Sequence, residues 1–271
     1  MFEEAKSSSC LQGFYTGKPK QQAKAELTLG AGLSEGKKAM DTTFQLIAVT
    51  DAASCPRSLA EQVERLALCE HKPHKLILRA KELDAAAYRQ LAQEVLPLCQ
   101  RHGIQLIIHS HWKVALALGV TSVHMPLALL AQMPAAAKDL CTATPEQQQA
   151  AHCPLLSTSV HSIAEAQKAL VLGANTLIAG HIYATNCKKG LPPRGVAFLR
   201  SIYDAVVKHT TPTNYPAHQQ AAPLQLATPQ QILPSLTLYA IGGIGFDAKQ
   251  WLELKKAGAT GACIMSAYMQ L

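Results

Sequence analysis

Short apolar runs alternate with longer amphipathic segments along the chain from residue 44 to residue 265. The short runs are rich in Val, Ile, Leu and Ala, which is typical of strands buried on both faces. They predict strands at residues 44–49, 75–78, 104–108, 121–124, 155–158, 176–179, 237–241 and 261–265. Between them, apolar residues that recur every three or four positions predict helices at residues 59–70, 85–102, 163–172, 196–208 and 248–257. A short helix is expected at residues 112–118, and a weak, proline-interrupted one at residues 127–137.

This alternation of strands and helices predicts the fold class. Eight strands, nearly all separated by helices, favour a parallel sheet closed into a (β/α)₈ TIM barrel over residues 44–271. In such barrels the functional side chains lie on the loops that follow the strands. The candidate residues can therefore be sorted by their position after each predicted strand.

Three segments depart from the repeat. Residues 1–43 are rich in Lys, Gly, Ser and Gln without sustained periodicity, so we expect a loosely ordered N-terminal extension, with Met40 as an alternative start. Residues 209–236 contain no Asp, Glu, Lys or Arg and predict a neutral, mobile insertion before the seventh strand, at the barrel end opposite the site. Few residues follow the eighth strand, which predicts a truncated last helix. The extension or a partner subunit could then cover the exposed flank, and a homodimer is plausible.

Composition limits the partners. The 271 residues include 48% hydrophobic ones and carry a net charge of +7, with a pI of about 9.0, which favours anionic ligands. The basic residues are dispersed and only 5% of residues are aromatic, which argues against nucleic acid. The chain shows no apolar stretch of membrane-spanning length and no signal peptide, and its eight cysteines form no CxxC pair. We therefore expect reduced thiols, a cytoplasmic location and no membrane association.

The loop after the sixth strand carries the densest candidate chemistry. Residues 180–195 read GHIYATNCKKGLPPRG, and we call them the sixth loop. His181 stands where the strand gives way to the loop, and an imidazole that titrates near neutrality beside Lys188 is a credible proton carrier. Thr185 and Cys187 add polar groups, and we favour a lining role for Cys187 because no base or acidic partner for a nucleophile is evident. A buried structural histidine or an ordinary basic surface turn are the alternatives.

Further polar groups follow other predicted strands. Gly242 and Gly243 after the seventh strand, with Met265 and Ser266 after the eighth, occupy the usual place of a barrel phosphate site, where backbone N–H groups can approach an anion closely. The remaining candidates for binding substrate are Arg79 and Lys81 after the second strand, His109 after the third and Ser159 after the fifth.

The histidines near the strand ends could suggest a metal site. Besides His109 and His181, they are His111, His124 and His161. Carboxylate ligands are absent from these positions, so we expect no metal and no other cofactor. For His161 we expect a structural hydrogen bond to a neighbouring loop.

Together these segments resemble the thiamine phosphate synthase/TenI superfamily. The similarity covers roughly residues 44–268 without the insertion, and is carried by FQLIAVTD, LRAK, LIIHSHWKVALALGVTSVHMP, STSVHSIAEAQKAL, the sixth loop, YAIGGI and AGATGACIMSA. The resemblance implies a (β/α)₈ barrel. It also implies that the basic residues Arg79, Lys81 and Lys188, and the polar residues Ser159 and Thr185, match ligand-facing positions of the family.

Departures from the synthase pattern indicate which branch of the superfamily this chain resembles. Synthases carry an Asn-Asp pair after strand three, where this chain has His109-Ser110, and an acidic residue after strand four, where it has Met125-Pro126-Leu127. Both Mg²⁺-binding carboxylates of the family are thus missing. The sixth loop begins Gly180-His181 instead of the synthases' Gly-Pro, and is similar to the TenI-type thiazole tautomerases.

The resemblance implies a metal-independent isomerisation of the non-aromatic carboxythiazole phosphate to its aromatic tautomer in thiamine biosynthesis. His181 would be the general base that removes the ring proton between sulfur and nitrogen. The alternatives are a Mg²⁺-dependent thiamine phosphate synthase and a non-catalytic, phosphate-binding regulatory protein. From the sequence, His109 could replace a catalytic group or fill the space of the missing metal.

Overall fold

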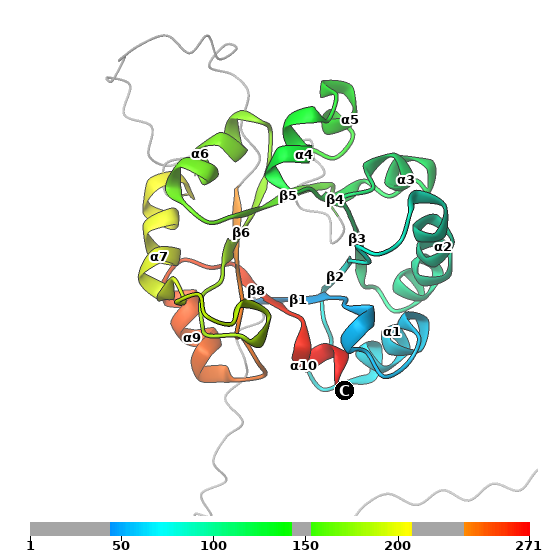
Figure 1. The fold of residues 1–271 in the computed structure, drawn as a ribbon, viewed down its shortest axis with the longest axis horizontal. Helices are drawn as coiled ribbons and strands as arrows, with labels where there is room; N and C mark the ends of the chain where they lie inside the picture. Colours follow the sequence, from blue (N-terminus) through cyan, green and yellow to red (C-terminus); the bar gives the residue numbers. More distant parts are fainter. Residues whose placement is uncertain (1–43, 143–152, 208–235) are drawn as a thin grey trace, which may run out of the picture. The chain divides into compact units, whose positions relative to one another are not determined.

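The computed structural model describes residues 44–142, 153–207 and 236–271. Eight parallel strands close into a barrel in the order of the sequence, from β1 to β8 (Figure 1). The strands are β1 (Gln45–Val49), β2 (Lys75–Leu78), β3 (Gln105–His109), β4 (Ser122–His124), β5 (Leu155–Val160), β6 (Thr176–Gly180), β7 (Thr237–Ile241) and β8 (Gly261–Ile264). Pairing of β1 with β8, in register from Gln45 opposite Gly261, closes the ring. The predicted fold class is confirmed.

The alternation of side chains along each strand divides the core into two layers. Residues that point into the barrel form a small apolar cluster, consisting of Ile47, Val49, Ile77, Ile107, Leu155, Ile178, Tyr239 and Cys263. Their neighbours in sequence, such as Leu46, Leu76 and Leu106, point outward into the larger cluster beneath the helices. Because both faces are covered, the strands read as nearly continuous apolar runs.

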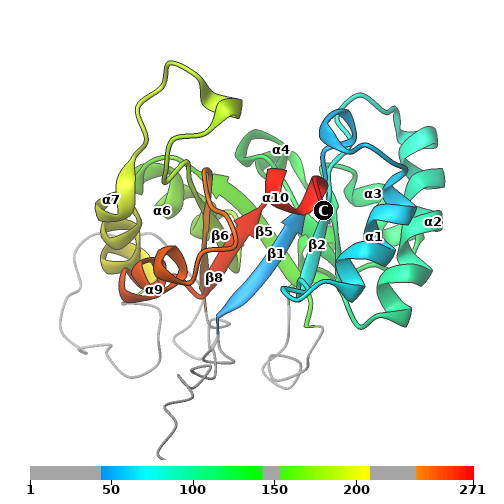
Figure 2. The same ribbon diagram turned by 90° about the horizontal axis from the view of Figure 1, so that it is seen from below.

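Helices surround the barrel (Figures 1 and 2). They are α1 (Leu59–Leu68), α2 (Ala85–Arg101), α3 (Trp112–Ala117), α4 (Leu127–Gln132), α5 (Ala135–Asp139), α6 (Ile163–Val171), α7 (Gly195–Ile202), α9 (Ala248–Lys256) and α10 (Ser266–Met269), with 3₁₀ turns at η1 (Ala52–Ser54) and η3 (Asn186–Lys188). Side-chain caps fix where several helices begin: Ser58, Asp84, Ser162 and Asp247 each accept a hydrogen bond from a backbone N–H of the first turn.

The predicted elements are present, with shifted bounds. The weak helix expected at residues 127–137 is two short helices, α4 and α5, because Pro134 begins the second one. The helix expected at residues 196–208 continues from α7 into a π-helical turn, η4 (Tyr203–Val207). The extension 1–43 and nearly all of the insertion 209–236 lie outside the described residues, so those two predictions stay predictions.

The last helix, expected to be truncated, is the four-residue α10. It lies between α9 and α1 in both views (Figures 1 and 2). Tyr268 is fully buried and donates from its hydroxyl to the carbonyl of His71 at 2.6 Å, while the Arg57 guanidinium donates to the carbonyl of Leu271 at 2.6 Å. The rings of Phe44, His71, Phe246, Trp251 and Tyr268 pack in a chain of contacts at 4.9 to 6.3 Å. Aromatic side chains therefore cover much of the flank where the sequence suggested an exposed surface.

No helix in the described ranges is long and apolar enough to cross a membrane.

Candidate active site

The carboxyl ends of the eight strands meet at one end of the barrel, which we call the mouth. The segment between β6 and α7 stands out from this end, beside the loop that follows β7 (Figure 2). Parallel pairing brings the candidate residues to this common rim from strands that are distant in sequence. The residues divide into a half built on β2–β5 and a half built on β6–β8.

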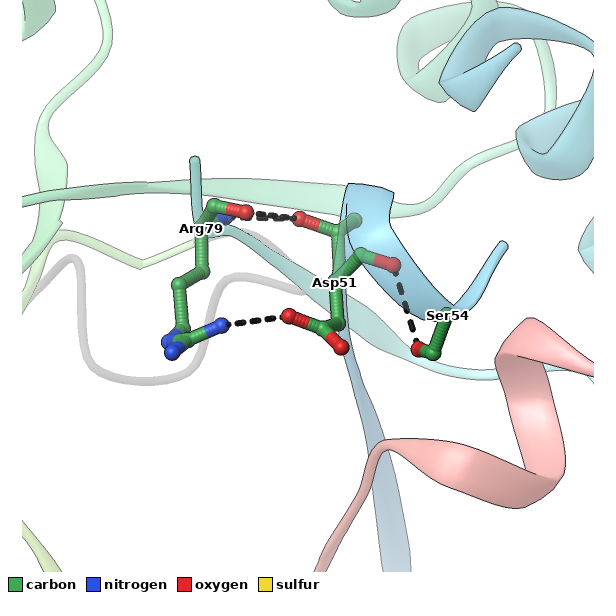
Figure 3. A network of polar contacts seen from close by, with 4 residues as sticks. Asp51, Ser54 and Arg79 are labelled. Atoms are coloured by element: carbon green, nitrogen blue, oxygen red, sulfur yellow. Dashed lines mark hydrogen bonds and ion pairs between the residues drawn. The ribbon is translucent and has the colours of Figure 1, made fainter. Parts of the chain in front are cut away.

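At the ends of β1 and β2, a polar network holds Arg79 in place (Figure 3). Its guanidinium forms an ion pair with Asp51 at 2.9 Å, and its backbone N–H donates to the Thr50 hydroxyl at 2.7 Å. That hydroxyl in turn donates to the Arg79 carbonyl at 2.8 Å. The side chain of Arg79 is 25% exposed, so it is not fully enclosed by this network. Sequence reasoning proposed Arg79 but missed Asp51, 28 residues away, which partly neutralises it.

Next to this network is a cavity of about 250 Å³, which we call the histidine cavity. It is lined by Lys81, His109, His124, Pro126, Leu127, Ser159, His161 and Glu165. Three of the predicted substrate-binding residues, Lys81, His109 and Ser159, thus come together here. Lys81 forms no ion pair with any described residue, although the Glu165 carboxylate lines the same cavity.

His109 is fixed by the residue that follows it. The Ser110 backbone has φ of 64°, a left-handed conformation that costs energy for a residue with a side chain. This conformation turns the Ser110 hydroxyl back onto Nδ1 of His109 at 2.8 Å. Nδ1 is thereby occupied, and Nε2 is the ring nitrogen that remains for a ligand.

His124 lies beneath His109 and is 5% exposed. The two imidazole rings stack with centroids 5.4 Å apart and planes 27° apart. Both nitrogens of His124 have hydroxyl partners: Nδ1 contacts Ser157 at 2.9 Å, and Nε2 contacts Ser159 at 3.1 Å. A polar chain therefore runs from the interior of the barrel to Ser159 at the cavity.

Burial keeps both stacked imidazoles neutral. It lowers the pKa of His109 from 6.5 to about 4, with further contributions from the charges of Arg79 and Lys81 and from His111. Burial, followed by the neighbouring His109, lowers the pKa of His124 to about 3. At neutral pH these rings offer hydrogen bonds to a ligand and carry no charge.

The expected partner of His161 was wrong. Nδ1 of His161 contacts Glu165 at 3.1 Å, and its backbone N–H donates to the same carboxylate at 2.7 Å. Glu165 belongs to the first turn of α6, which directly follows His161, so the bond is local and not to a neighbouring loop. The four-residue spacing suits a carboxylate that returns to the start of its own helix.

In the other half, His181 is placed by the Gly242–Gly243 turn. Gly242 has φ of +102°, and a Cβ built there would lie 2.4 Å from Cβ of His181. A Cβ on Gly243 would lie 2.4 Å from the Ala184 carbonyl oxygen. Backbone bonds continue the pairing beyond the strands, since Tyr183 donates to the Gly242 carbonyl at 3.0 Å. The predicted catalytic residue and the predicted phosphate-binding glycines are thus adjacent because the glycines lack side chains.

The His181 ring is loosely held. Nε2 has one contact, at 3.4 Å, with the carbonyl oxygen of Leu191 within the same loop. The loop is closed at its base, where the Arg194 N–H donates to the His181 carbonyl at 3.0 Å. His181 therefore has a fixed backbone and a ring with little hydrogen bonding of its own.

The tip of the sixth loop stands apart from the histidine cavity. Cys187 and Lys188 are exposed in η3 and Thr185 is half-buried just before it, and none of the three lines the cavity. After β8, Ser266 is exposed and begins α10, while Met265 is half-buried against the apolar cluster inside the barrel. Their backbones lie at the mouth, as expected for loops after β6 and β8.

The residues at the ends of β3 and β4 do not fit a divalent metal. Mg²⁺ prefers oxygen ligands, especially carboxylates. The cavity presents His109 and His124 there, with the Lys81 charge close by, and its one carboxylate, Glu165, is bonded to His161. Among the described residues no group of three or more His, Cys, Asp or Glu side chains is arranged to hold a metal ion.

A sequence model of the thiamine monophosphate synthase family, TMP-TENI, matches residues 46–268. The chain belongs to this family. The family is one of enzymes of thiamine biosynthesis, and the match covers the whole barrel, including both halves of the mouth.

Several curated relatives of this family are named thiamine-phosphate synthase. The protein from Lysinibacillus sphaericus is 30% identical over 187 residues, which cover 68% of each chain. The one from Methanospirillum hungatei is 30% identical over 191 residues, covering 70% of this chain and 73% of the relative. The aligned part spans 35% of the relative from Gloeobacter violaceus and 53% of that from Thermus thermophilus.

A solved structure shows the same fold. Thiamine phosphate pyrophosphorylase from Pyrococcus furiosus aligns with a TM-score of 0.57 and 21% identity, over 84% of this chain and 89% of that chain.

Proposed function

We propose that this chain is a thiazole tautomerase, which converts the non-aromatic carboxythiazole phosphate to its aromatic tautomer without a metal. One observation carries the proposal: His181 stands at the barrel mouth, packed against the glycine turn that is suited to a phosphate group. A proton carrier next to an anion site is what an isomerisation of a phosphate ester requires.

In this reaction the phosphate would be held by backbone N–H groups at Gly242, Gly243, Met265 and Ser266. His181 would remove the ring proton between sulfur and nitrogen, and a proton would then be delivered to the exocyclic carbon. Its loosely bonded ring suits this role, since the accepting nitrogen must be free to approach the substrate. Arg79, Lys81 and Lys188 would spread the negative charge that develops, and Thr185 and Cys187 would line the site.

A second candidate is a thiamine-phosphate synthase, which the names of the relatives favour. A synthase that condenses a pyrimidine diphosphate with a thiazole phosphate would need Mg²⁺ to neutralise the leaving diphosphate. The neutral imidazoles at the ends of β3 and β4 argue against it. A regulatory role without catalysis is the third candidate, and it predicts that His181→Ala leaves cellular phenotypes unchanged.

The test is the rate of aromatic thiazole phosphate formation from the non-aromatic tautomer, measured with EDTA present. We expect a metal-independent rate well above that in buffer, and a fall of about a hundredfold or more in His181→Ala. His102→Ala serves as the control, because His102 ends α2 and pairs with Glu64 away from the mouth. A wild-type rate no faster than buffer would contradict the proposal, and Mg²⁺-dependent condensation would favour the synthase.

A further inference from the structure

The histidine cavity contains two imidazoles, His109 and His124, that the isomerisation step at His181 does not use. It holds one cation, Lys81, and two neutral imidazoles whose orientation is fixed by serines. The hydrogen-bond donors of this cavity indicate which chemical group of a ligand could bind there.

Two donors, Lys81 and His109, can point toward the cavity. If the Ser110 hydroxyl donates to Nδ1 of His109, the Nε2–H of His109 faces the ligand. The Ser157 hydroxyl donates to the Val123 carbonyl at 3.2 Å. Nδ1–H of His124 therefore donates to Ser157, and Nε2 of His124 accepts from the Ser159 hydroxyl. Lys81 adds an ammonium group with three further donors.

Such a set suits a planar anion that only accepts hydrogen bonds. A carboxylate has two oxygens that only accept hydrogen bonds, which match an ammonium and an imidazole N–H. The cavity also includes Glu165, but this carboxylate is turned toward the backbone N–H and ring of His161. It does not lie in any ion pair with Lys81.

We propose that the histidine cavity binds the carboxylate of the substrate through Lys81 and His109, with His124 and Ser110 as positioning residues, and that it makes the protein selective for the carboxylated thiazole phosphate. This inference rests on the proposed function. It divides the mouth between a carboxylate end on β2–β5 and a phosphate end on β7–β8, with His181 on the intervening sixth loop.

The strained backbone of Ser110 supports the assignment of the histidine cavity as a ligand site. A left-handed serine is unfavourable unless the surrounding structure holds it, and such residues gather at ligand sites. Here the strain has a specific result, because it brings the hydroxyl onto Nδ1 and leaves Nε2 for the ligand.

The experiment compares two probes by calorimetry: the aromatic carboxythiazole phosphate and its decarboxylated counterpart. Wild-type protein should bind the carboxylated probe at least about tenfold more tightly, the effect of one charge-assisted interaction or more. Lys81→Met and His109→Ala should abolish this preference by weakening binding of the carboxylated probe more than binding of the decarboxylated one. His109→Gln, which keeps an N–H donor, should retain part of it.

Lys113→Ala is the matched control, because Lys113 is an exposed cation on α3 outside the cavity. Circular dichroism of each variant verifies folding. Independently, NMR titration should show the His109 pKa rising on addition of the carboxylated probe and not of the decarboxylated one, since a nearby anion favours the charged imidazole.

The outcomes separate the two proposals. If wild-type protein binds both probes equally, or if Lys81→Met and His109→Ala keep the wild-type preference, the carboxylate assignment is wrong while the tautomerase assay with His181→Ala is untouched. If neither probe binds, the carboxylate assignment is wrong, and the tautomerase proposal is decided by its rate assay. If the preference is lost in the two variants and His181→Ala keeps it while losing turnover, both stand.

Discussion

The two halves of the mouth are built differently. On the β2–β5 side, His109 and His124 end their strands and both rings have hydrogen-bond partners, Ser110 for His109 and Ser157 and Ser159 for His124. On the β6–β7 side, His181 is placed through its backbone by glycines, and its ring has one long contact. The first arrangement suits recognition by groups of fixed orientation, and the second suits proton transfer by a ring that must meet its substrate.

The largest expected effect is on the half placed by glycines. Gly242→Ala introduces a side chain at φ of +102°, with a Cβ 2.4 Å from that of His181, so it must displace the candidate base. We expect tautomerase turnover to fall by about a hundredfold or more. Gly245→Ala is the control, because its φ is not positive and a Cβ there would meet no atom within 4 Å. Equal activity of the two variants would mean that His181 is not held by the glycine turn.

For the half built on strands, we expect the free energy of unfolding to depend on pH in the acidic range. The pKa values of His109 and His124 are about 4 and 3 in the folded protein and 6.5 ordinarily, so the unfolded chain binds more protons below about pH 6.5. The free energy of unfolding should therefore be fully present above pH 6.5 and fall as the pH is lowered toward 4, by up to about 1.4 kcal/mol per pH unit for each imidazole.

Denaturant titration of wild type and His124→Gln between pH 7.5 and 4.5 measures this slope. The variant retains polar contacts without a titrating group, so its loss of stability with acid should be smaller. Identical slopes would show that His124 does not titrate as its burial implies.

The smallest effect is expected at the tip of the sixth loop. Lys188→Ala removes an exposed charge and should raise KM by a few fold with kcat nearly unchanged, since a solvated charge contributes little. Cys187→Ser should change neither parameter by more than about twofold if the thiol only lines the site. Steady-state kinetics in low and high salt provide the measurement. A large loss of kcat in Cys187→Ser would indicate a chemical role for the thiol. The catalytic groups would then not be confined to His181 at the base of the sixth loop.

Prediction from sequence succeeded where the signal is local. The strands around His109 and His181 were found from apolar runs, and the glycine pair was found from its position after a strand. It failed for partners that are set by packing: Asp51 was not linked to Arg79, His161 was assigned to a neighbouring loop, and His124 and Ser110 were not given the positions that order His109. The positive φ of Ser110 could not be predicted from the sequence, because serine is not enriched in the left-handed region.

The sequence by itself determined the eightfold alternation, the mouth as the place of the candidate residues, and the absence of carboxylates at His109 and His124. These follow from periods of two and three to four residues and from residue identity, which need no knowledge of distant contacts. Only the tertiary structure decided that His124 meets Ser159 across 35 residues, that Asp51 neutralises Arg79, and that His181 lies against Gly242. The reason is that closure of the barrel and the register of neighbouring strands decide which side chains face one another, and both are properties of the whole sheet.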